Sequence, residues 1–385
     1  MLSTLKSSLK VSLVSLILIF SLTEVSQAHK HPESYSHDGG RKTCQPCWMK
    51  YLKDDVLLSE LSIPGTHDTM SFYDTDYSQT QSMALPFQLQ SGIRVLDIRC
   101  RHMGNRFRIY HGFVDQRVWF YEVLNMVAKF LEDHPSETVL MRVKEEHTPL
   151  NSNRAFEETF RKEYWEPYKK HMWQGTSVNP TLGEMRGKIV ILQDFDREAS
   201  INPRYGIPYS SFDFQDYFQL DGNADLYNKW EKVKKHLEAA NSGPRDTKYI
   251  NYLSGAGLGS GGSLGLPFPY FVASGHSDPR TIAPRLWTGK WNKDHPNLWP
   301  NFPRINCGVQ TCISYEGTNT LTYGAILNGY YPKRVGIIMT DFPGWGLINQ
   351  IIDLNKPFWK VPGHRPNECN EDRPSLCGQP RHRSK

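Results

Sequence analysis

No stretch of this 385-residue chain is both long and apolar enough to cross a membrane as a helix. The formal net charge is only +5, which is too small to indicate nucleic-acid binding but suits an anionic membrane surface. No Asn-x-Ser/Thr sequon with x other than Pro occurs, so N-glycosylation is not expected. There is no internal repeat. The glycine-rich segment 254–269 lacks the Lys and Ser/Thr of a phosphate loop, and we interpret it as a mobile rim loop.

The first 28 residues have the pattern of a secretory signal peptide. Lys6 and Lys10 precede an apolar-rich run at 11–22, and Ala28 ends a small-x-small cleavage site. That run is too short for a membrane anchor, because a spanning helix needs about 20 residues. We therefore expect a secreted, extracellular protein. The expected parts are a signal peptide at 1–28, a polar, flexible arm at 29–50, one domain at 51–358 and a Cys-, Pro- and Arg-rich tail at 359–385.

The cysteines indicate disulfides, since an exported chain matures in an oxidising compartment. Two alternatives are disfavoured but stay open: a zinc site formed by two of the short cysteine pairs, and a redox motif at Cys44 and Cys47. The simplest pairing joins close neighbours and leaves one thiol free in a strand: Cys44/Cys47, Cys307/Cys312 and Cys369/Cys377, with Cys100 unpaired.

Strand-like and helix-like segments alternate across the central 300 or so residues. The strand-like segments are nearly continuous in apolarity, which is typical of strands buried on both faces. This alternation predicts the α/β class, as a doubly wound sheet or a parallel barrel, and we favour a single irregular (β/α) TIM-type barrel. The expected strands are 57–63, 94–99, 106–110, 138–144, 188–194, 249–253 and 335–341, and the expected helices are 115–133, 152–170, 224–240 and 347–354.

Two histidines and an arginine each come at the end of a strand-like segment. They are His67, Arg99 and His111. Because the site of such a barrel lies at the carboxyl ends of its strands, we expect these side chains to meet there. One imidazole can remove a proton, the other can supply one, and the guanidinium can hold negative charge on phosphorus. The set is therefore what cleavage of a phosphodiester requires.

The segments that carry these residues resemble the X domain of phosphatidylinositol-specific phospholipases C, especially the small bacterial-type enzymes. The resemblance lies in six segments that occur in the same order and together span nearly the whole mature chain. They are 62–68, 92–99, 110–112, 135–138, 186–192 and 336–342.

The resemblance implies a role for each catalytic residue. His67 would be the general base for the inositol 2-hydroxyl, with Asp341 orienting it. Arg99 would stabilise the charge on the non-bridging oxygens. His111, polarised by Asp68, would protonate the leaving diacylglycerol oxygen, although Asp68 as a simple turn cap stays open. The products would be diacylglycerol and inositol 1,2-cyclic phosphate.

The resemblance also implies that no metal or other cofactor is needed. Calcium-dependent relatives build a cation site from carboxylates, whereas metal-independent members have an arginine there, as Arg99 in this chain. Glu145 and Glu146 are the best objection, because they follow a strand end. One alternative is a metal-dependent glycerophosphodiesterase or sphingomyelinase-D-like barrel hydrolase, but the segment Asp97-Ile98-Arg99 lacks the Glu-x-Asp pair of those enzymes.

The head-group pocket departs from the family pattern. Lys144 and Asp216 are expected to bind inositol hydroxyls. The family's tyrosine is Phe218 here, with Tyr217 as a shifted substitute, and acidic Asp194 stands where a basic residue usually follows the strand. A catalytically silent lipid- or glycan-binding protein on the same barrel therefore stays open, as do glycosylphosphatidylinositol anchors as substrates.

Three tryptophans fall in one polar, proline-rich segment. Trp287, Trp291 and Trp299 lie near Lys293, a combination that favours the headgroup region of a membrane. They could equally pack against one another inside a loop. We expect a monomer that acts on a phosphoinositide-containing membrane surface and binds no nucleic acid.

Overall fold

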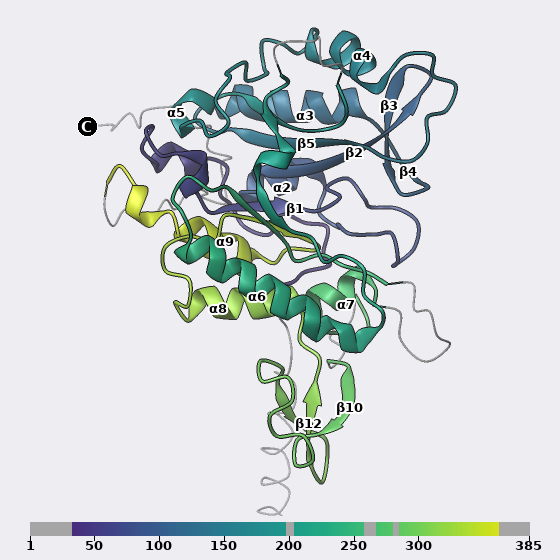
Figure 1. Ribbon diagram of the computed structural model, residues 1–385, viewed down its shortest axis with the longest axis vertical. Coiled ribbons are helices and arrows are strands. Elements are labelled where there is room, and N and C mark those ends of the chain that lie inside the picture. Colours follow the sequence, from purple (N-terminus) through teal and green to yellow (C-terminus); the bar gives the residue numbers. More distant parts are fainter. Residues whose placement is uncertain (1–32, 198–203, 258–266, 280–284, 362–385) are drawn as a thin grey trace, which may run out of the picture.

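The computed structural model describes residues 33–197, 204–257, 267–279 and 285–361. Its centre is a curved sheet of parallel strands with helices on the outside (Figure 1). The two end strands are not paired with each other in the described chain, so the barrel stays open, which confirms the predicted irregular barrel. The strand order is β7 (Ile207–Pro208), β6 (Ile189–Asp194), β5 (Val139–Glu145), β2 (Val95–Met103), β1 (Ile63–Thr66), β13 (Ile337–Thr340), β9 (Tyr249–Tyr252) and β8 (Asp213–Gln215).

Helix α3 buries one apolar stripe on its inner face. In α3, Val123, Leu124 and Val127 are fully buried, at the spacing of one helical face. Among the described residues no helix is long and apolar enough to cross a membrane. The helices are α2 (Leu85–Ser91), α3 (Phe120–Asp133), α4 (Phe156–Phe160), α5 (Leu182–Met185), α6 (Leu226–Ser242), α7 (Pro269–Ser274), α8 (Thr318–Leu327) and α9 (Trp345–Asp353).

Three predicted elements were wrong at their boundaries. The strand expected at 57–63 begins only at its last residue, because Leu58–Glu60 forms a 3₁₀ turn whose Glu60 side chain accepts a hydrogen bond from the Leu57 amide. The first part of 115–133 is strand β4 (Val114–Trp119), which pairs with β3 (Arg106–His111). The segment 152–170 contains only short helix α4 and a π-helical turn at Arg161–Trp165.

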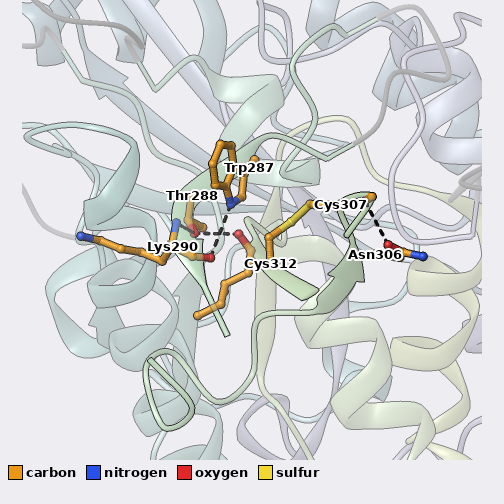
Figure 2. The surroundings of a disulfide bond; sticks show 8 residues. Trp287, Thr288, Lys290, Asn306, Cys307 and Cys312 are labelled. Atoms are coloured by element: carbon orange, nitrogen blue, oxygen red, sulfur yellow. Dashed lines mark hydrogen bonds between the residues drawn. A yellow bond between two sulfur atoms is a disulfide. The ribbon is translucent and has the colours of Figure 1, made fainter. Parts of the chain in front are cut away.

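A second, three-stranded antiparallel sheet was not predicted. It projects from the barrel below α7 and α8 (Figure 1) and consists of β10 (Trp287–Trp291), β12 (Thr311–Ser314) and β11 (Arg304–Asn306). The Cys307–Cys312 disulfide links β12 to the loop after β11 (Figure 2), which confirms that predicted pair.

The remaining cysteines and the chain ends give a mixed outcome. Cys100 is free and buried, as predicted. Cys44 and Cys47 are disulfide-bonded, and their pairing with each other stays a prediction. Residues 33–50, expected as a flexible arm, pack on the barrel: Trp48 is buried and its indole N–H donates to the Gly92 carbonyl at 3.0 Å. The signal peptide, residues 258–266 of the glycine-rich loop, the Cys369/Cys377 pair and the tail from residue 362 lie outside the described residues.

A buried ion pair ties the start of β2 to the start of β5. Arg94 and Glu137 are both fully buried, and the guanidinium donates to the carboxylate from Nε at 3.0 Å and Nη2 at 2.8 Å. The carboxylate also accepts from the backbone amides of Met49 and Lys50. The segments 92–99 and 135–138, which carried part of the family resemblance, therefore also contain the ion pair that joins β2 to β5.

We expect Glu137→Gln to lower the free energy of unfolding by about 3–5 kcal/mol, because it leaves the Arg94 charge buried without its partner. The matched control is Asp133→Asn, which breaks the exposed Lys129–Asp133 pair and should cost less than about 1 kcal/mol. Urea denaturation of both variants checks this. Equal losses in the two variants would show that the buried pair does not hold the strands together.

Candidate active site

The register of two parallel strands brings His67 and Asp341 together. Thr66 of β1 pairs with Thr340 of β13, so the next residue of each chain segment emerges at the same edge of the sheet. His67 Nδ1 donates to Asp341 Oδ1 at 2.9 Å. This bond fixes the ring and leaves Nε2 as the nitrogen with the lone pair.

Arg99 lies against the other side of that ring. Its Nη2 donates to His67 Nε2 at 2.8 Å and to Asp97 Oδ2 at 3.0 Å, while its Nε is 3.0 Å from Asp68 Oδ1. The guanidinium is therefore held by two carboxylates from different segments. It touches the nitrogen that would accept a proton.

His111 ends β3, which folds back antiparallel on β2. Its Nδ1 donates to the Ser78 carbonyl at 2.7 Å, and its Nε2 is 3.4 Å from Asp68 Oδ2. Because the carbonyl can only accept, Nε2 carries a second proton only when the ring is cationic. Asp68 faces that nitrogen, so His111 has the geometry of a general acid.

The surroundings of His67 favour its neutral form for physical reasons. Burial, and then the nearby Arg99 charge, lower the pKa of His67 well below its usual range, so the ring is neutral near pH 7. Burial also raises the pKa values of the Asp68 and Asp341 carboxyls. A neutral His67 suits the base, and a carboxylate behind each ring suits a site that moves one proton in and one proton out.

A cavity of about 440 Å³ brings most of the predicted residues together. It is lined by His67, Arg99, His111, Lys144, Asp216 and Asp341. Asp68 lies just beneath, with 3% of its surface exposed.

Two neighbours of Asp216 point in different directions. Phe218 lines the cavity and is 60% exposed, whereas the Tyr217 hydroxyl donates to Asp225 at 2.9 Å and Tyr217 is not among the cavity-lining residues. In this structure the proposed tyrosine substitute thus lies apart from the other head-group residues.

Sequence reasoning missed Arg142 of β5, which also lines the cavity. It bridges Asp97 of β2 and Asp194 of β6, with donor–acceptor distances of 3.2 and 2.7 Å. A signal was present: Arg142 interrupts an apolar strand two residues before Lys144, so both side chains emerge on the same face of β5.

Glu146 has a structural partner on each side. One of its carboxylate oxygens accepts from the Gly112 amide at 3.0 Å, and the other lies 3.3 Å from Lys144 Nζ. Within the described ranges no group of three or more His, Cys, Asp or Glu side chains is arranged to hold a metal ion. Metal independence stays a prediction.

The predicted tryptophans occupy two different environments. Trp287 and Trp291 lie on β10 with their ring centroids 5.0 Å apart and their planes tilted by 54°. Trp287, which is 44% exposed, is labelled in Figure 2. Trp299 instead packs among Tyr227, Phe302 and Tyr315 at the base of the small sheet.

Comparison with known proteins agrees with this geometry. Residues 55–194 match the family model of the phosphatidylinositol-specific phospholipase C X domain. The chain is 30% identical to a 1-phosphatidylinositol phosphodiesterase of Staphylococcus aureus over 292 residues, which cover 67% of this chain and 83% of that protein. It is 38% identical to the 1-phosphatidylinositol phosphodiesterase of Listeria monocytogenes over 161 residues, which cover 38% of this chain and 48% of that protein.

The fold agrees as well. The solved phosphatidylinositol-specific phospholipase C from Listeria monocytogenes superposes with a TM-score of 0.58 at 26% identity, covering 81% of this chain and 98% of that one. The shared segments include the strands that carry His67, Arg99 and His111. The chain therefore belongs to the phosphatidylinositol-specific phospholipase C X-domain family.

Proposed function

We propose that this protein is an exported phospholipase C that cleaves phosphatidylinositol to diacylglycerol and inositol 1,2-cyclic phosphate. The bacterial relatives support phosphatidylinositol-specific phosphodiesterase activity. The observation that carries the proposal is that His67 Nε2 and His111 Nε2 both lie 3.4 Å from Asp68 Oδ2, with Arg99 bound to His67, at one cavity. A base, an acid and a cation thus share one small volume.

The proposed reaction uses the substrate's own hydroxyl as nucleophile. His67 Nε2 takes the proton of the inositol 2-hydroxyl as its oxygen forms a bond to phosphorus. Arg99 stabilises the charge on the non-bridging oxygens. The bond from phosphorus to the diacylglycerol oxygen breaks, and His111 Nε2 gives its proton to that oxygen. Asp341 and Asp68 stabilise the cationic forms of the two rings.

The membrane contact is proposed at the small sheet. Exposed Trp287 and half-buried Trp291 form an aromatic pair on β10, close in sequence to Lys290 and Lys293. Amphipathic rings with nearby lysines favour the membrane–water interface. Because Trp299 packs inward, we restrict the proposed contact to the first two tryptophans.

Phosphorus NMR of phosphatidylinositol vesicles tests the chemistry. In excess EDTA the wild-type protein should produce a cyclic inositol phosphate signal, and His67→Ala should lower the rate by about 10²- to 10⁴-fold, because it removes the general base. Product that forms only after calcium or magnesium is restored would overturn metal independence. The absence of a product signal both in EDTA and after calcium or magnesium is restored would overturn the proposed substrate.

The acid limb of the kcat/KM profile should lie below pH 6.5, because burial and Arg99 lower the pKa of His67. Activity is retained above that lowered pKa and lost as the pH falls through it, when the base becomes protonated.

Imidazole NMR should show the His67 titration moving to higher pH in Arg99→Gln, since the neighbouring cation is gone. A downward shift, or none, would contradict the electrostatic coupling of the two residues.

Trp287→Ala combined with Trp291→Ala should weaken binding to phosphatidylinositol-containing vesicles by about 10-fold or more, since burial of these rings in the interface is lost. Hydrolysis of a water-soluble inositol phosphodiester should not change. Trp345→Ala is the matched control, because Trp345 is 39% exposed but lies on α9. Sedimentation with vesicles measures the binding, and equal losses in both variants would contradict a specific contact.

A further inference from the structure

Arg142 is a fixed cation in the wall of the cavity. Its side chain is 9% exposed, and it leaves β5 beside Asp97 of β2, its register partner. The guanidinium lies 4.4 Å from the ring of Tyr209. Because the Arg142 guanidinium is held at its face and at its edges, its orientation is fixed. A ligand in the cavity would therefore meet a preorganised donor.

The hydrogen bonds of Arg142 leave a donor for a ligand. Nε and Nη2 donate to Asp194 at 2.9 and 2.7 Å, while Nη1 donates to Asp97 at 3.2 Å and to the Tyr252 hydroxyl at 3.0 Å. A guanidinium has five N–H groups, of which two are on Nη2. The second Nη2 hydrogen has no protein acceptor among the described residues, and Arg142 lines the cavity.

The charge balance indicates what kind of group this donor meets. Two carboxylates, Asp97 and Asp194, already surround the single positive charge of Arg142. A third anion would therefore find little uncompensated charge there, whereas a neutral hydroxyl oxygen can accept the remaining N–H. This favours a hydroxyl over a phosphate as the ligand group.

Two other residues that line the cavity supply complementary groups. Lys144 emerges two residues after Arg142, on the same face of β5, and also lines the cavity. Asp216 follows β8, at the far end of the strand order from β7, β6 and β5. Donors from one wall and an acceptor from the other suit a ring that carries several hydroxyls, each of which can donate and accept.

We propose that Arg142 is a head-group contact that binds ring hydroxyls of the inositol, and that Asp194 is its positioning residue. The basic residue expected after β6 is thus replaced by a cation from the neighbouring strand, and the acid at position 194 holds that cation in place. This inference rests on the proposed function, because it names a specificity-determining contact for the inositol lipid.

The test measures myo-inositol binding by calorimetry, together with kcat and KM for phosphatidylinositol in detergent-mixed micelles. Arg142→Gln should raise the Kd for myo-inositol and the KM by about 10- to 100-fold, as expected for one charged hydrogen bond, with a smaller fall in kcat. Asp194→Asn and Arg142→Lys should each weaken binding by a smaller factor, because they keep the cation but loosen its position. If Arg142→Gln does not fold, these two variants decide the question.

Arg285→Gln is the matched control. Arg285 also has 9% side-chain exposure and pairs with Glu316 at 2.7 Å, but it is not among the residues that line the cavity. It should leave inositol binding unchanged. Mannitol, an acyclic polyol, serves as the control ligand and should bind no variant.

The outcomes separate this inference from the proposed function. Unchanged myo-inositol affinity in Arg142→Gln, with or without a loss of kcat, would overturn the inference and leave Arg142 acting only through Asp97 on Arg99. A wild-type protein that cleaves the lipid without binding myo-inositol would also overturn it. A wild-type protein that binds myo-inositol through Arg142 but cleaves nothing would overturn the proposed function alone, and one that does neither would overturn both.

Discussion

The site depends on one buried carboxylate. Asp97 is 1% exposed and accepts hydrogen bonds from Arg99 and from Arg142. Burial alone would raise its pKa, but the two guanidinium groups hold that pKa well below its usual range, so Asp97 stays charged. It also accepts from the Asp68 amide at 3.3 Å. A single side chain thus fixes both arginines and the turn that follows His67. Neutralising it would leave each buried guanidinium with only one of its two carboxylates, Asp68 for Arg99 and Asp194 for Arg142.

Parallel register explains why residues so far apart in the chain converge on that carboxylate. Asp97 pairs with Arg142 and Arg99 pairs with Lys144 across β2 and β5, while Thr66 and Thr340 pair across β1 and β13. A parallel sheet aligns the carboxyl ends of its strands, so polar residues at those ends form one layer above an apolar interior. A slip of one residue in any pairing would send these side chains to the opposite face of the sheet.

The sequence allowed the barrel and most of the residues that meet at the cavity to be predicted, because both depend on local patterns. Apolar runs mark the buried strands. His67 follows β1 and His111 ends β3, whereas Arg99 ends the apolar run but lies inside β2, which continues to Met103. The sequence did not reveal that Arg142 belongs to the site, because its ion pairs with Asp97 and Asp194 join three different strands and are visible only in the structure. The small sheet was missed because its strands are short, partly exposed and stabilised by a disulfide rather than by apolar periodicity.

The contact between Arg99 and His67 places a condition on the proposed chemistry. In the free protein an Arg99 N–H occupies the lone pair of His67 Nε2, at 2.8 Å. A base in that state cannot accept a proton, so the guanidinium must release the ring before the hydroxyl is activated. A phosphodiester is a better acceptor for a guanidinium than a neutral imidazole, because its oxygens carry a full charge. In the proposed mechanism, binding of the phosphate would therefore have two consequences at once: it would place Arg99 on the oxygens that gain charge, and it would free the base that starts the reaction.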